Sequence, residues 1–102
     1  MFQHIVLWKF KEYANEKSKE ENIQICRDNL YALREKIPQI RHMEVGADQL
    51  HTAASYDMIL ISGFDSQEDY FIYRDHPDHI AAGKYLSSCV TDRVCIDYEV
   101  GD

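Results

Sequence analysis

Seven consecutive residues, Tyr73 to His79, bring together two imidazoles, a phenol and two carboxylates. Pro77 bends the chain there, because its ring fixes φ and disfavours a helical conformation for His76. Proline also suits the first position of a helix, so we expect a helix from Pro77 with Asp75 or His76 as its cap. His79 then lies in the first turn, where the positive helix end disfavours its protonation. The segment predicts either a neutral base beside a tyrosine or a corner that two histidines cap and buttress.

A metal site is a weaker interpretation of the same histidines. His76 and His79 supply two ligands, and only His4 could supplement them, with no cysteine or carboxylate at a diagnostic spacing. His4 itself stands among aromatic residues, where a single histidine is more often a satisfied core residue than a ligand. We therefore predict no metal and no cofactor.

Composition limits the classes of partner. At 102 residues with 45% hydrophobic residues, the chain predicts one domain over residues 1–102 with a small core. The net charge of -7, from 18 acidic and 11 basic residues, repels nucleic-acid phosphates and anionic lipid surfaces. We predict neither a nucleic-acid partner nor a membrane partner.

The three cysteines indicate a reducing environment. Cys26 falls in an apolar helical stripe, and Cys89 and Cys95 are too far apart in an extended segment to form a disulfide. The N-terminal residues show no basic region followed by a long apolar run. These features predict packed, reduced thiols and a cytoplasmic location.

The hydrophobic periodicity predicts alternating strands and helices. An apolar stripe at helical spacing ends at Ile37, before Pro38, and its helix begins within a charged stretch with either Ser18 and Glu21 as a capping box or Asn15 as an earlier cap. We expect strands over residues 2–11, 40–48, 56–64 and 90–100, and helices over residues 18–37, 66–75 and from residue 77 onward. This order predicts an α+β fold, a ferredoxin-like βαββαβ domain with a four-stranded antiparallel sheet.

The first predicted strand is apolar on both faces. Val6 and Trp8 lie on one face, whereas Ile5 and Leu7 lie on the other. The helices of one small chain cover only one face of such a sheet, so a second copy must cover the other. We expect a homodimer.

Three segments carry a resemblance to a known family: residues 4–11 (HIVLWKFK), residues 73–79 with a His-Pro-X-His core, and residues 94–98 (VCIDY). With these motifs the chain resembles the stress-responsive A/B barrel domain (Dabb) family over nearly its whole length. The resemblance implies a dimeric α/β barrel. The family includes plant heat-stable proteins, bacterial proteins without assigned chemistry, and olivetolic acid cyclase, which closes a polyketide ring by aldol condensation.

The resemblance also implies site residues. The tyrosine and histidine that act in that cyclase fall on Tyr73 and His79, and its first-strand pocket histidine falls on His4. We place Trp8 and His76 with His4 in the ligand-binding set. A neutral base and a phenolic donor are what proton abstraction next to a carbonyl requires.

Two functions follow as hypotheses, and a third rests on fold analogy. The first is a stress-associated dimer that binds a small hydrophobic or carbonyl-containing ligand in the barrel without catalysis. The alternative is a proton-transfer enzyme of polyketide cyclase or isomerase type, with His79 as base and Tyr73 as hydrogen-bond donor. The third hypothesis is haem-handling or oxygen-using chemistry. It is known among other ferredoxin-like dimers, and for this chain it rests on the similarity of fold alone.

Overall fold

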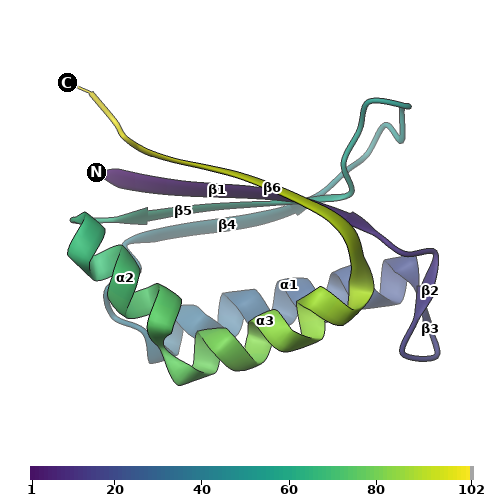
Figure 1. Ribbon diagram of the computed structural model, residues 1–102, viewed down its shortest axis with the longest axis horizontal. Helices are drawn as coiled ribbons and strands as arrows, with labels where there is room; N and C mark the ends of the chain where they lie inside the picture. Colours follow the sequence, from purple (N-terminus) through teal and green to yellow (C-terminus); the bar gives the residue numbers. More distant parts are fainter. Residues whose placement is uncertain (102) are drawn as a thin grey trace.

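A computed structural model describes residues 1–101 of the chain and contains a four-stranded sheet in the order β4-β5-β1-β6. The strands, all antiparallel to their neighbours, are β1 (Phe2–Phe10), β4 (His42–Ala47), β5 (Met58–Phe64) and β6 (Val90–Glu99). The helices α1 (Lys19–Lys36), α2 (Gln67–Asp75) and α3 (Pro77–Cys89) all lie against the same face (Figure 1). The predicted ferredoxin-like α+β fold is confirmed.

Strand β1 lies between β5 and β6 in the sheet, and its two faces differ in burial. Its residues alternate between buried and partly exposed from Phe2 to Phe10, and the buried set includes His4 and Trp8. The buried side chains join the core under the helices, as the alternation predicts. His4 therefore lies on the helix-covered face.

Helix α1 begins where its sequence signals place it. The Ser18 side chain accepts from the Glu21 backbone, and the Glu21 side chain accepts from the Ser18 backbone, which makes the predicted capping box. In the middle of the helix, the Tyr31 hydroxyl donates to the Val45 carbonyl and accepts from the Val45 amide. One side chain thus ties α1 to the edge strand β4.

A two-stranded hairpin precedes α1, where only a charged helix start was predicted. It pairs β2 (Tyr13–Ala14) with β3 (Lys17–Ser18) through a turn at Asn15 and Glu16, whose φ values of 55° and 61° suit a tight hairpin. The interpretation of Asn15 as an earlier helix cap is therefore wrong. Its side chain instead donates to Ser88 Oγ at 2.9 Å and ties the hairpin to the end of α3.

The corner between α2 and α3 forms at the predicted proline. His76 ends α2 and caps α3, and its Nδ1 accepts from the Asp78 amide at 3.1 Å. Pro77 occupies the first position of α3. The bend directs α3 back beneath the sheet beside α1 (Figure 1).

None of the described residues forms a helix on the other face of the sheet (Figure 1). Register pairs Ile5 with Ile96 and Leu7 with Val94, so these apolar side chains share that face. Val94 is 46% exposed and Ile96 59% exposed. Within residues 1–101, none of the helices is both long enough and apolar enough to cross a membrane.

Candidate functional site

A cavity of about 240 Å³ lies between the sheet and the helices, inside one chain. It is therefore separate from the helix-free face. Aromatic and apolar side chains make most of its wall, and a few polar groups converge there, as in small-molecule sites. Its lining includes His4, Val6, Trp8, Leu60, Tyr70, Tyr73, Arg74, His79, Gly83, Leu86 and Arg93.

His79 lines the cavity from the first turn of α3. Its Nδ1–H donates to the Arg74 carbonyl at 3.0 Å, so the neutral ring keeps its lone pair on Nε2. Burial lowers the pKa of His79 most, the hydrogen bond to Arg74 opposes that shift, and the positive charge of Arg93 lowers it further. His79 is consequently neutral near physiological pH and able to accept a proton.

Tyr73 lies beside His79, and their ring centroids are 4.3 Å apart. Tyr73 is fully buried, and its hydroxyl has no hydrogen-bond partner within residues 1–101. Burial raises the pKa of this phenol, so the hydroxyl keeps its proton and remains a donor. A neutral base and an unpartnered donor thus stand side by side.

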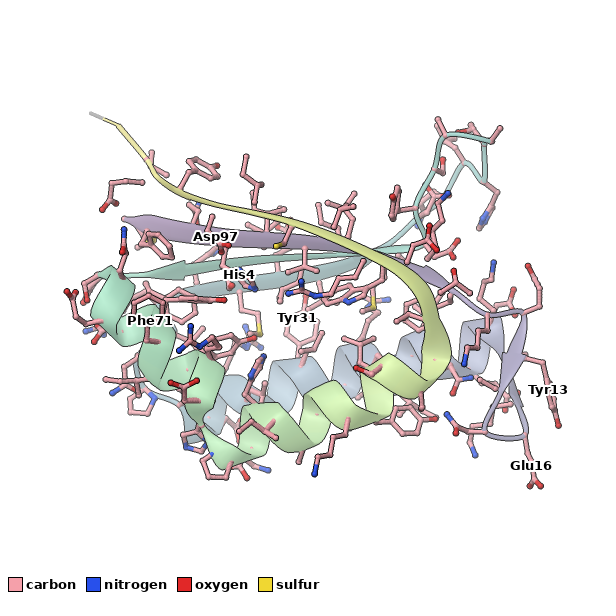
Figure 2. The ribbon with its side chains drawn as sticks, in the orientation of Figure 1. His4, Tyr13, Glu16, Tyr31, Phe71 and Asp97 are labelled. Atoms are coloured by element: carbon pink, nitrogen blue, oxygen red, sulfur yellow. The ribbon has the colours of Figure 1, made fainter. Side chains whose placement is uncertain are left out.

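His4 faces the same cavity from β1 and pairs with Asp97 of β6. Its Nδ1 hydrogen-bonds to the Asp97 carboxylate, and Figure 2 shows the two side chains together at the sheet. Burial lowers the pKa of His4, and the bond to Asp97 opposes that shift. The Tyr70 ring lies 4.7 Å from the His4 ring, between centroids. The carboxylate orients the imidazole with Nε2 available.

Two arginines also reach the cavity. Arg74 is held by Asp75 through Nε at 2.9 Å and Nη2 at 3.2 Å. Arg93 comes from β6, where it lies opposite Trp8 in the register. The polar groups of the site therefore come from both layers of the fold.

The structure brings four of the five predicted site residues together: His79, Tyr73, His4 and Trp8 all line the cavity. His76 lies outside the lining, with its ring engaged in capping α3. Within residues 1–101, no group of three or more histidine, cysteine or acidic side chains is placed to hold a metal ion.

Sequence reasoning missed Tyr70, Arg93 and Asp97. Alternation along β6 puts Arg93 and Asp97 on one face, but only the register with β1 shows that this face is the one that carries His4. Tyr70 precedes Tyr73 by three residues, so the two share a side of their helix, and that spacing is the signal that would have included Tyr70.

The family model described as Stress Responsive A/B Barrel Domain matches residues 2–100. No curated protein sequence matches the chain.

Solved structures include similar chains. A dimeric protein of unknown function with a ferredoxin-like fold from Bacteroides fragilis is 34% identical, with a TM-score of 0.85 over 97% of this chain and 95% of that chain. A dimeric ferredoxin-like protein of unknown function from Thermobifida fusca is 25% identical, with a TM-score of 0.84 over 97% and 90%. A hydroxynitrile lyase from Passiflora edulis, 19% identical with a TM-score of 0.81 over 99% and 94%, shares the fold.

Proposed function

The chain belongs to the stress-responsive A/B barrel domain family, and from that premise we propose that it is a cytoplasmic homodimer that binds a small hydrophobic, carbonyl-containing ligand. The ligand occupies the cavity between the sheet and the helices, where His79, Tyr73, His4 and Trp8 converge. The similar proteins from Bacteroides fragilis and Thermobifida fusca are described as dimeric. Two buried thiols, Cys26 and Cys89, support a reducing compartment.

The Tyr73 hydroxyl is the observation that carries this function. A buried hydroxyl without a partner costs about 1 to 3 kcal/mol, which a folded protein normally avoids. Since the raised pKa keeps the phenol protonated, the partner it lacks is an acceptor such as a carbonyl oxygen. The apolar walls at Val6, Trp8 and Leu60 favour a ligand that is otherwise hydrophobic.

The geometry of His79 favours a second function, proton transfer. Its Nε2 is the free nitrogen of a neutral imidazole, because Nδ1–H is engaged by the Arg74 carbonyl. In this reaction Nε2 takes a proton from the carbon next to the ligand carbonyl, and the enolate oxygen that forms accepts a hydrogen bond from Tyr73. Such a step belongs to cyclases of polyketide type and to isomerases.

Ligand binding is tested by a screen of small aromatic ketones and aldehydes, read by NMR shift changes and by the melting temperature. We expect binders to shift His79 and Tyr73 resonances, and we expect Tyr73→Phe to lose about tenfold in affinity. Without ligand, Tyr73→Phe should melt no lower than the parent, because it removes an unpartnered hydroxyl. Tyr13→Phe, at an exposed hairpin position, is the matched control. Unchanged ligand affinity in Tyr73→Phe contradicts the assignment.

A ketone that binds the parent protein is then used to distinguish catalysis from binding. Exchange of its α-hydrogens for deuterium is followed by NMR in D₂O. If the protein is a proton-transfer enzyme, His79→Ala should slow exchange by roughly 10²- to 10⁴-fold while the ketone still binds. A parent that binds the ketone without accelerating exchange is a binding protein only.

A further inference from the structure

Arg93 is a cation of the cavity whose side chain has no partner among the described residues. It lies on β6 opposite Trp8 and lines the cavity, and its exposed side chain makes neither an ion pair nor a hydrogen bond within residues 1–101. A guanidinium offers five N–H donors in a planar fork that matches a carboxylate. Arg93 therefore has its full donor capacity available to a ligand.

The other charged groups of the site are already engaged. Arg74 is held by both oxygens of Asp75, and Asp97 is held by His4. Asp97 lies four residues beyond Arg93 on the same strand, which separates their backbones by about 13 Å. Arg93 is thus an unpaired positive group of the cavity, and none of the described residues that line the cavity carries a carboxylate.

The positive charge of Arg93 affects the pKa values of the polar groups in the cavity. It contributes to the lowered pKa of His4 and of His79, after the larger effect of burial on each. It also opposes the burial that raises the pKa of Tyr73. None of the ion pairs formed by the described residues involves Arg93.

We propose that the natural ligand is an anion, a small oxo acid whose carboxylate binds Arg93 while its carbonyl oxygen meets Tyr73 and His79. This assignment rests on the proposed function and narrows its substrate class. The ligand lies along β1, with its carboxylate near Trp8 and its carbonyl carbon between the sheet and the α2–α3 corner. Arg93 acts by binding and orienting, and no bond to it is made or broken.

The test compares benzoylformate with its uncharged methyl ester, which keeps the aromatic ring and the ketone. Affinities are measured by calorimetry for the parent, Arg93→Gln, Arg93→Lys and the control Arg41→Gln. Arg41 is paired with Asp65 away from the cavity. We expect the parent to bind the acid about tenfold tighter than the ester, and Arg93→Gln to bind both equally. Arg93→Lys should retain part of the preference, since it keeps the charge and loses the fork.

Salt provides a second readout of the same contact. Affinity for the acid should fall as NaCl is raised, because the pair is open to solvent, whereas affinity for the ester should not. If the parent binds both compounds equally and Arg93→Gln changes neither affinity, the oxo-acid assignment is overturned and ligand binding stands. If the parent binds neither compound nor any ketone of the screen, the proposed function and this assignment fall together.

Discussion

Two imidazoles face one cavity from opposite layers of the fold, His4 from β1 and His79 from α3. Each uses Nδ1 for a hydrogen bond, to the Asp97 carboxylate and to the Arg74 carbonyl respectively. Burial is the main cause of the lowered pKa in both rings. Two neutral histidines are therefore part of the folded state.

The lowered pKa values predict that the protein loses stability in mild acid. Below the ordinary histidine pKa of 6.5 the unfolded chain binds protons that the folded chain resists, so the free energy of unfolding falls as pH decreases toward the folded-state values. We expect the melting temperature to drop between about pH 7 and pH 5.5, before most carboxylates titrate.

Substitution identifies the histidines responsible for that drop. His79→Gln should make the melting temperature less dependent on pH in this window, because glutamine does not titrate. His51→Gln, on an exposed loop, is the control. An equal pH slope in His79→Gln and the parent would argue against a partly buried, neutral His79.

At the level of elements, the α2–α3 corner positions the site. His76 ends one helix and caps the next, and Pro77 starts α3 with a fixed φ. The corner places Tyr73 in the last turns of α2 directly beside His79 in the first turn of α3. His76 thus lies outside the cavity, and its capping of α3 helps to position the residues that line the cavity.

Changes at His76 distinguish capping from ligand binding. We expect His76→Ala to lower the free energy of unfolding by about 1 kcal/mol, because the Asp78 amide loses its acceptor, and His76→Asn to restore it. Denaturant unfolding measures both. Ketone affinity should stay within error in His76→Asn, and a loss of affinity there would return His76 to the ligand-binding set.

At the scale of the whole molecule, the helix-free face of the sheet is energetically unfavourable in a monomer. Ile5 and Leu7 meet Val94 and Ile96 across the register, and a monomer would leave this apolar face in water. The helices lie entirely on the opposite face (Figure 1). A second copy that covers this face removes the exposed area and leaves the cavity of each chain intact.

The expected homodimer is tested by a charge on that face. Ile96→Asp should convert a species of twice the chain mass into a monomer, because a carboxylate cannot be buried there without a partner. Leu50→Asp, at an 80% exposed loop position, is the matched control and should remain dimeric. Light scattering across a range of concentrations decides, and a parent that is monomeric throughout contradicts the dimer.

Local physics in the sequence determined the elements of this protein. Alternation along residues 2–11 predicted which residues of β1 share a face, Ser18 and Glu21 predicted the start of α1, and Pro77 predicted the corner. Each of these signals acts between residues close in sequence, through pleat, capping and a fixed φ. The sequence does not predict the β2–β3 hairpin, because its strands are too short to show a hydrophobic periodicity.

Tertiary structure alone decided how the site is composed. His4 and Asp97 are 93 positions apart, and they meet because β6 pairs with β1 in one particular register. A shift of one residue would turn Arg93 and Asp97 to the helix-free face, since side chains alternate along a strand. The unpartnered Tyr73 hydroxyl likewise depends on which layers enclose it. Patterns within a segment name candidate residues, whereas register and packing between distant segments determine which of them share a cavity.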